Sequence, residues 1–327
     1  MTVQDVAATC GVSAMTVSRV MRGIDGVGSE TRARVEHAID ALGYVPNGNA
    51  QALAAADSRL IGISLPNLFN DVFADVLEGM RRTLLQSGYA SVVDTTDYDP
   101  ERELEWVRRM VGWRPAALIL TGCLHDPALR DLVARAGIPV LEMWDVTDDP
   151  IDLCVGIDHR AAAEALGRHV VALGYRRPAF VGTPEGLDPR ADARAAGLAD
   201  AFRGAGTSLA RLAADGESAF DTGARGFGAR PADADVVFFH NDNGAFGGII
   251  AAEAAGLTVP HDIGIVGFNG LQITKVMRRP LTTMETPRRQ IGLTAAHRLL
   301  ARLNGVRPSR VTALPCRLVP GATIQMQ

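Results

Sequence analysis

The feature that most constrains this fold is a regular alternation of short apolar runs and helical stretches that begins near residue 60. The candidate strands are the runs 60–65, 90–95, 117–121, 140–143, 154–157, 179–182, 209–212, 236–240 and 263–268. Amphipathic helices fit between them at 73–86, 101–111, 128–136, 161–172, 191–203 and 244–255. A strand–helix–strand repeat predicts parallel sheets with helices on both faces. About 260 residues of this pattern exceed one sheet, so the chain predicts two doubly wound lobes that divide near residue 158.

The first 45 residues lack such runs and predict a small all-α head of three helices. Thr2, Ser13 and Ser29 each precede an apolar pattern with helical spacing and are candidate N-caps. Residues 46–58 are polar and rich in alanine. They predict a linker with helical propensity that is too short to be a stable helix alone.

Composition and charge exclude several classes of protein. Hydrophobic residues make up 47% and charged residues 21% of the chain, which is typical of a globular protein with large cores. No apolar run approaches the ~18 residues of a membrane span, so no membrane partner is expected. The N-terminus shows no secretory signal, and the expected location is the cytoplasm. The net charge of −4 by itself does not predict a polyanionic partner.

No residue pattern points to catalysis, to a metal or to a cofactor. The cysteines Cys10, Cys123, Cys154 and Cys316 are scattered without a CxxC pair, which argues against a zinc site and a disulfide framework. The chain contains no GxxxxGK[ST] phosphate loop and no obvious nucleophile–base pair. We therefore assign no catalytic residue and expect no enzyme, such as a nucleotide-dependent dehydrogenase.

Polar, aromatic and cationic residues gather after the predicted strands. Ligands of doubly wound sheets bind beyond the carboxyl ends of the strands, which makes these positions candidates for a site. Arg190 and Arg194, four residues apart at the start of one helix, could fork onto a carboxylate. The rings of Phe73, Trp144 and Phe220 could pack against the apolar faces of a ligand. Asn and Asp side chains could exchange hydrogen bonds with its hydroxyl groups. This chemistry suits a sugar or a sugar acid.

Each of these residues also has a plainer interpretation. Arg190 and Arg194 lie in a helix rich in arginine and alanine and could form an exposed, solvated face. His240 and Asp242 could suggest acid–base chemistry, but we prefer an Asp that caps the following helix. The glycine-rich stretch 223–228 is interpreted as a loop or a frayed helix.

The pattern DVA-x-x-x-GVS-x-x-TVSR-V at residues 5–20 resembles the LacI/GalR family of bacterial transcription regulators. The second half carries further segments similar to this family, namely GYRRPAFVG, HNDNGAFGG, PHDIGIVGFN and PLTTMETP. The resemblance covers the whole chain and implies a helix-turn-helix domain, a hinge and a periplasmic-binding-protein-like domain with two lobes. Their expected bounds are 1–45, 46–58 and 59–327, with the lobes at about 59–157 plus 287–315 and about 158–286 plus 316–327.

The resemblance implies how the head contacts DNA. The second helix would enter the major groove, with Ala14, Met15 and Arg19 facing base edges. The side chains expected to reach phosphates are Ser13, Thr16 and Ser18. Asn47 and Leu53 would belong to a hinge that folds only when two copies meet on DNA, and Leu53 would wedge into a minor-groove step.

Within the family, segments such as LPNLFNDVFADVLEGM and GWRPAALILTGCLHDP resemble gluconate-operon repressors. The implied effector is gluconate or a related aldonate or ketoaldonate. The positions that match effector contacts of the family are Phe73, Thr121, Trp144, Arg190, Arg194, Phe220, Asn241, Asp242 and Asn269.

The function implied is that of a homodimeric repressor on a near-palindromic operator in double-stranded DNA, with operator affinity controlled by the effector. Two alternatives remain open at this point. One is a regulator of the same family that responds to a neutral sugar, and the other is a sugar-binding protein with no role on DNA.

Overall fold

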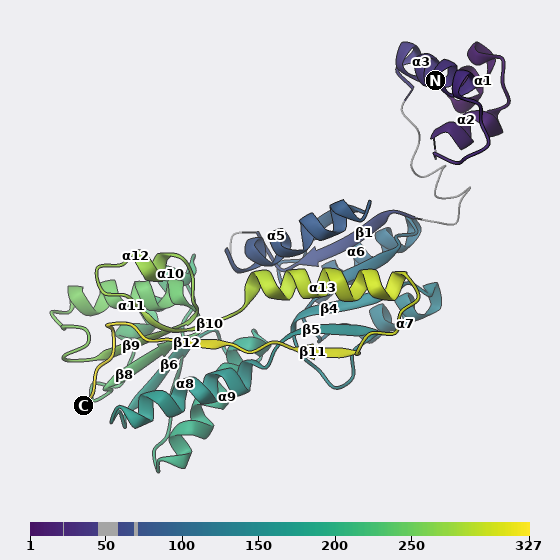
Figure 1. The fold of residues 1–327 in the computed structure, drawn as a ribbon. Helices are drawn as coiled ribbons and strands as arrows, with labels where there is room; N and C mark the ends of the chain where they lie inside the picture. The colour runs from purple at the N-terminus through teal and green to yellow at the C-terminus, as the bar shows by residue number, and fades with distance from the viewer. Residues whose placement is uncertain (22, 45–57, 69–70) are drawn as a thin grey trace. The chain divides into compact units, whose positions relative to one another are not determined.

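The computed structural model describes residues 1–21, 23–44, 58–68 and 71–327, and the hinge residues Asn47 and Leu53 lie outside these ranges. The chain forms two compact units, Met1–Ser58 and Arg59–Gln327. Figure 1 shows the helical head and the larger two-lobed unit. No helix in the described ranges is both long and apolar enough to cross a bilayer.

In the described part of the head, three short helices surround a small apolar core. The helices are α1 (Val3–Cys10), α2 (Ala14–Met21) and α3 (Ser29–Leu42). Val6, Val17 and Val35 are fully buried between them, so one residue from each helix meets at the centre. Thr2 caps α1 as predicted, with its hydroxyl accepting from the Asp5 amide. The predicted cap at Ser29 is wrong, because α3 begins at Ser29 and no side chain caps it.

The first lobe is built on an all-parallel sheet with the strand order β11-β5-β4-β3-β1-β2. Its strands are β1 (Leu60–Leu65), β2 (Ala90–Thr95), β3 (Ala117–Thr121), β4 (Val140–Asp145), β5 (Leu153–Ile157) and β11 (Val311–Ala313). Its helices are α5 (Asp71–Gln86), α6 (Pro100–Gly112), α7 (Pro127–Ala136) and α13 (Arg288–Leu303). Helices α5 and α13 pack together, as do α6 and α7. The apolar strand residues divide between these two helix pairs, which is the layering expected for a doubly wound sheet.

The second lobe repeats this arrangement with the strand order β12-β10-β9-β8-β6-β7. Its strands are β6 (Pro178–Gly182), β7 (Ala210–Ala213), β8 (Val236–Phe239), β9 (Gly264–Asn269), β10 (Thr282–Glu285) and β12 (Arg317–Val319). The helices are α8 (His159–Ala172), α9 (Pro189–Gly204), α10 (Ala219–Gly228), α11 (Asp242–Ala254) and α12 (Ile273–Val276). Only the β10–β12 pair is antiparallel among the strand pairs of the described residues.

The chain crosses between the lobes three times, after β5, after β10 and after β11. Helix α13 and strand β11 therefore return to the first lobe after the second lobe has formed, as the yellow segments of Figure 1 show. Strands from both lobes approach the region between the lobes, and this topology places strand ends where the sequence predicted a ligand.

The glycine-rich stretch 223–228, which we interpreted as a loop or a frayed helix, is not a loop but part of a helix. It forms the end of α10, which Ser218 caps through the amide of Asp221. Gly223 permits close packing on α11, because a Cβ at this position would lie 2.0 Å from the carbonyl oxygen of Gly244. Glycine lowers helix propensity, but here it permits contact between helix backbones.

We predict that Gly223→Ala destabilises the protein by about 1–3 kcal/mol, since the new methyl group cannot fit against the α11 backbone. The matched control is Gly228→Ala in the same helix, where an added Cβ meets nothing within 4 Å. Urea unfolding followed by circular dichroism measures both variants. Equal midpoints for the two variants would contradict this account of α10.

Candidate functional site

A cavity of about 350 Å³ lies between the lobes, at the ends of the parallel strands. Both lobes contribute side chains to its wall. The lining residues are Val72, Phe73, Asp97, Tyr98 and Trp144 from the first lobe, and Thr183, Leu187, Asp188, Arg190, Arg194, His240, Asn241 and Asn269 from the second. A molecule in this cavity would therefore contact both lobes at once.

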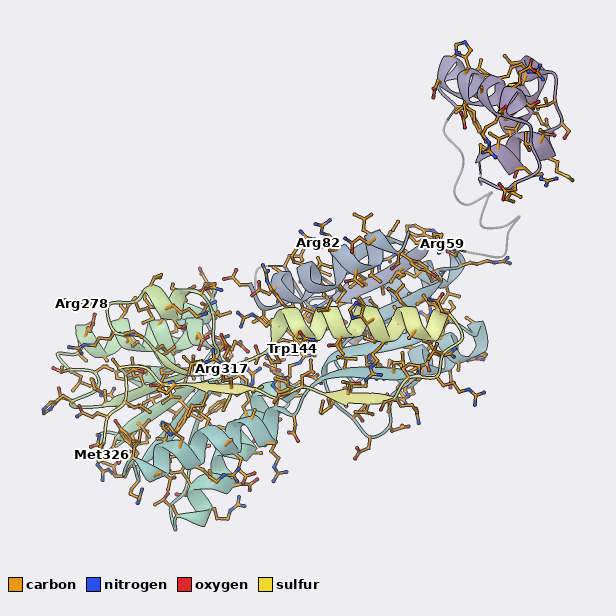
Figure 2. The ribbon with its side chains drawn as sticks, in the orientation of Figure 1. Arg59, Arg82, Trp144, Arg278, Arg317 and Met326 are labelled. Atoms are coloured by element: carbon orange, nitrogen blue, oxygen red, sulfur yellow. The ribbon has the colours of Figure 1, made fainter. Side chains whose placement is uncertain are left out.

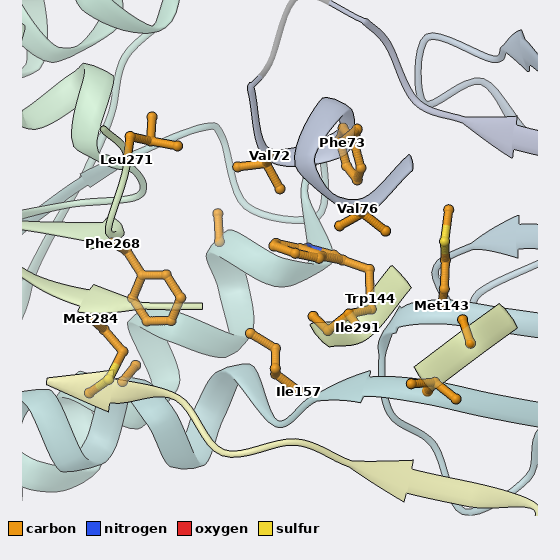
Figure 3. Packing of buried hydrophobic residues seen from close by; sticks show 14 of the residues in the cluster. Val72, Phe73, Val76, Met143, Trp144, Ile157, Phe268, Leu271, Met284 and Ile291 are labelled. Carbon is orange, nitrogen blue, oxygen red and sulfur yellow. The ribbon is translucent and has the colours of Figure 1, made fainter. Parts of the chain in front are cut away.

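The first lobe supplies an aromatic wall. Phe73 at the start of α5 meets Trp144 edge to face, with ring centroids 5.8 Å apart. Trp144 has a backbone φ of +85°, an uncommon conformation for a bulky residue, and only 2% of it is exposed. Figure 2 shows Trp144 where side chains of the two lobes meet, and Figure 3 shows it packed near Phe73, Val76 and Ile291. The wall offers an apolar surface to the carbon skeleton of a ligand.

An ion pair between the lobes borders the cavity. The Arg190 Nε donates to both carboxylate oxygens of Asp145, at 2.8 and 3.0 Å. Burial alone would raise the pKa of Asp145, but the charge of Arg190 and a hydrogen bond from His159 hold it well below its usual range. Asp145 is thus a fixed anion, and the charge of Arg190 is neutralised by it.

Arg194 differs from Arg190 because no carboxylate of the described residues lies within ion-pair distance of it. Its guanidinium donates to the His240 carbonyl oxygen and, at 3.2 Å, to Nδ1 of His159, and it lies 4.1 Å from the centre of the Phe268 ring. Only 5% of Arg194 is exposed. The cavity wall therefore carries a buried cation whose charge has no direct partner.

Hydrogen bonds fix the proton on His159, which links Arg194 to Asp145. Arginine only donates, so Nδ1 of His159 accepts, and Nε2 carries the proton toward the Asp145 carboxylate 3.0 Å away. Burial, together with the charge of Arg194, lowers the pKa of His159 to about 4. A neutral His159 orients both charged side chains and does not cancel the charge of either.

Three buried polar atoms on the cavity wall have no hydrogen-bond partner among the described residues. They are Oγ1 of Thr183, Nδ1 of His240 and Oδ1 of Asn269. Buried polar atoms are usually satisfied, so a cluster of such atoms around one cavity indicates a polar ligand.

The His240 ring presents a donor. The Oδ1 of Asn241 caps α11 by accepting from the Gly244 amide, so its Nδ2 faces Nε2 of His240 at 2.8 Å. Nε2 therefore accepts, and the proton of the neutral ring is on Nδ1. Burial, followed by the charge of Arg194, lowers the pKa of His240 to about 4, which keeps the ring neutral near pH 7.

The cavity brings together six of the nine positions that sequence reasoning assigned to the effector. They are Phe73, Trp144, Arg190, Arg194, Asn241 and Asn269. The interpretation of Arg190 and Arg194 as an exposed, solvated face is wrong, because both are buried.

The other three positions do not line this cavity. Thr121 donates to the backbone oxygen of Ser64 at 2.8 Å, within the first sheet. Phe220 packs edge to face on Phe246. Asp242 is fully buried and does not cap α11, so the predicted cap was wrong, and Asn241 takes that role.

Sequence reasoning missed the first-lobe residues Asp97 and Tyr98 and the donor on His240. Asp97 and Tyr98 follow β2 with φ values of +52° and +61°, a left-handed turn that no glycine or Asn-Gly pair announces. His240 ends a predicted strand, and its position was noticed, but its proton assignment depends on the cap made by Asn241.

In the head, α2 presents the residues expected to contact DNA. Met15 is 72% exposed, and Ser13 is also exposed. The Ser13 hydroxyl caps α2 by accepting from the Thr16 amide at 3.1 Å. Half-buried residues of this helix are Ala14, Thr16, Ser18 and Arg19.

The Arg19 guanidinium donates to the Asp25 backbone oxygen at 2.8 Å, which fixes the side chain beside the loop after α2.

A helix-turn-helix head in one chain with a two-lobed domain and a polar cavity defines a ligand-responsive DNA-binding regulator. Comparison with known proteins supports this class. Residues 2–47 match the model of bacterial regulatory proteins of the lacI family. Residues 58–320 match the model of periplasmic binding proteins and the sugar binding domain of the LacI family.

Full-length relatives agree with these matches. The chain is 36% identical to the HTH-type transcriptional regulator GntR of Escherichia coli K12 over 326 residues, which cover 98% of each protein. A LacI family regulator from Silicibacter pomeroyi superposes with a TM-score of 0.91 at 36% identity, covering 99% of both chains. The structure of the lac repressor dimer bound to operator and the anti-inducer ONPF superposes with a TM-score of 0.84 at 27% sequence identity, also covering 99% of both chains. The chain belongs to the LacI family and is a DNA-binding transcriptional regulator, not an enzyme.

Asp242 makes the folding stability of this domain depend on pH. Its carboxylate accepts from the Thr283 hydroxyl at 2.5 Å and from the Leu271 amide at 2.7 Å. Burial raises its pKa to about 7, so between about pH 4 and pH 7 the folded protein holds a proton that the unfolded chain releases. This group therefore stabilises the fold at low pH, and its contribution is lost as pH rises through 7.

We predict that Asp242→Asn, which cannot ionise, removes this dependence. The melting temperature of the wild type minus that of the variant should fall as pH rises from 5 to 8. Differential scanning calorimetry at four pH values measures the difference, and other titrating groups cancel between the two proteins. A difference that stays constant or grows with pH would show that Asp242 titrates normally.

Proposed function

We propose that this chain is a homodimeric repressor whose affinity for a near-palindromic operator is lowered by a sugar acid bound between its lobes. The proposed effector is gluconate or a related aldonate or ketoaldonate. The observation that carries this proposal is the buried guanidinium of Arg194, which has no carboxylate partner among the described residues.

The charges around the cavity favour an anion with one charge. Arg190 is paired with Asp145, Asp97 is paired with Arg102 at 2.5 Å, and the Asp188 carboxylate caps α9. Arg194 is the remaining cation on the wall, and although the charge of Asp188 favours its charged form, it has no ion-pair partner among the described residues. A buried charge is costly until it is paired, and a planar guanidinium matches a carboxylate in geometry.

The rest of the wall suits the polyol part of such a ligand. Thr183, His240 and Asn269 offer unpartnered polar atoms for hydroxyl groups. Phe73 and Trp144 offer an apolar face for the carbon chain. A volume of about 350 Å³ is at the small end of ligand pockets, in keeping with a six-carbon acid.

For DNA we propose the contacts implied by the family. Ala14, Met15 and Arg19 face base edges, and the hydroxyls of Ser13, Thr16 and Ser18 reach phosphates. Asn47 and Leu53 contact DNA from the hinge when two copies are bound. The lac repressor structure, a dimer bound to operator, supports a two-fold complex.

The effector test compares the wild type with Arg194→Ala in calorimetric titrations of D-gluconate. Loss of a charge-assisted contact of about 2 kcal/mol predicts a roughly 30-fold weaker affinity, while operator binding survives. Arg168→Ala is the control, because Arg168 is an exposed arginine on α8 paired with Glu164. An unchanged gluconate affinity in Arg194→Ala would remove Arg194 from the site. Tighter binding of glucose than of gluconate by the wild type would favour the neutral-sugar alternative.

The DNA test uses Arg19→Ala. We predict a loss of about 1–3 kcal/mol on the operator, with weaker discrimination at one base pair in each half-site, and an unchanged gluconate titration. Arg34→Ala, an exposed arginine on α3, is the control. Fluorescence anisotropy with single-base operator variants measures both. Uniform weakening across all variants would mean that Arg19 contacts only phosphate.

A further inference from the structure

Arg288 belongs to the first lobe but contacts the second. It is the first residue of α13, and its side chain is 7% exposed. Its Nε donates to Oδ2 of Asp75 in α5, at 2.8 Å. The other end of the guanidinium donates to two backbone oxygens of the second lobe, those of Asn269 and, at 3.3 Å, Gly270. One planar group thus joins the two lobes.

The second-lobe end of this bridge is part of the cavity wall. Asn269 ends β9 with a φ of +110°, and its side-chain oxygen is one of the unpartnered atoms on the wall. Its backbone oxygen is the atom to which Arg288 donates. A ligand that bonds to the side chain of Asn269 therefore acts on the residue that Arg288 holds.

The first-lobe end of the bridge lies in a rigid pair of helices. A Cβ at Gly79 of α5 would lie 2.4 Å from the carbonyl oxygen of Arg289, and a Cβ at Gly292 of α13 would lie 2.0 Å from that of Val76. The two helix backbones are therefore in direct contact and cannot slide without breaking this packing. Since α5 also places Phe73 in the cavity wall, a displacement of Arg288 moves a helix pair as one body.

We propose that Arg288 is the positioning residue that couples effector occupancy of the cavity to the first lobe. The inference rests on the proposed effector control. Hydrogen bonds weaken steeply with distance and angle, so a rigid guanidinium satisfies Asp75 and the two carbonyls in only one relative position of the lobes. The bridge therefore favours one lobe arrangement, and a ligand that shifts Asn269 changes that preference.

Arg288 can be tested separately from ligand binding because it does not line the cavity. The ion pair of Arg190 with Asp145, which also joins the lobes, includes a cavity residue, so a change there removes a ligand contact as well. Arg289 offers a matched control. It is the next residue, 75% of its side chain is exposed, and its Nε lies 3.7 Å from Asp75.

The experiment measures the operator dissociation constant by fluorescence anisotropy, without gluconate and with saturating gluconate, in the full-length protein. The ratio of the two constants is the coupling factor, ordinarily about 5 to 150 in allosteric proteins. We expect Arg288→Met to bind operator and gluconate but to have a ratio within about twofold of one. Arg288→Lys, which keeps the positive charge but lacks the planar guanidinium with its several donors, should give an intermediate ratio. Arg289→Met should give the wild-type ratio.

A wild-type ratio in Arg288→Met would overturn the inference. If that variant does not fold, Asp75→Asn decides, because it keeps the contacts of Arg288 with the second lobe and removes its ion pair with α5. A wild-type ratio in Asp75→Asn would then reject the coupling role. A ratio of one in the wild type itself would reject the proposed effector control and the inference with it, so the two failures are distinguishable.

Discussion

The buried charge of Arg194 is the constraint on which the effector domain depends. A guanidinium without a carboxylate partner is costly in a protein interior, and here it is held by a neutral histidine, a backbone carbonyl and an aromatic ring. These groups orient the cation without neutralising it. The fold therefore contains a place where a small anion would relieve an electrostatic cost, and this place lies between the two lobes.

The topology explains how binding in the cavity can affect parts of both lobes that do not line it. The chain crosses between the lobes three times, so neither lobe is an independent segment, and α13 returns to pack on α5. Two of the side-chain bridges across the boundary are that of Arg190 to Asp145 and that of Arg288, which pairs with Asp75 in its own lobe, to the backbone oxygens of Asn269 and Gly270. The first borders the cavity, while the second holds the backbone of a cavity residue. Residues at the ends of β4 and β9 thus contribute both to the cavity wall and to the contacts between the lobes.

Much of the fold could be predicted because buried parallel strands are continuous apolar runs, and β1, β2 and β3 have the predicted bounds. Strand β10 was not predicted, because Thr282 and Thr283 are fully buried yet polar, and their partners come from distant segments. Helix α10 was left open between a loop and a frayed helix, because its glycines lower helix propensity; in the structure they permit close helix packing, a tertiary effect that overrides propensity.

The site was predictable to the extent that strand ends and side-chain chemistry define it. Arg194 and Trp144 could be selected on those grounds. The position of Tyr98 in the cavity wall depends on a left-handed turn that no glycine in the sequence indicates. Phe220 has a side chain that would suit a sugar, but it packs on Phe246 instead. The proton on His240 depends on a helix cap, and the role of Arg288 depends on the crossing of the lobes, so neither is visible in residue spacing alone.

The most direct test of the central claim compares gluconate with glucitol, an uncharged polyol with the same carbon chain. Operator affinity of the wild-type protein is measured by anisotropy while each compound is added. If a carboxylate on Arg194 controls the lobes, gluconate will release the operator and glucitol at the same concentrations will not. Equal release by both compounds, or release by glucitol alone, would contradict the account.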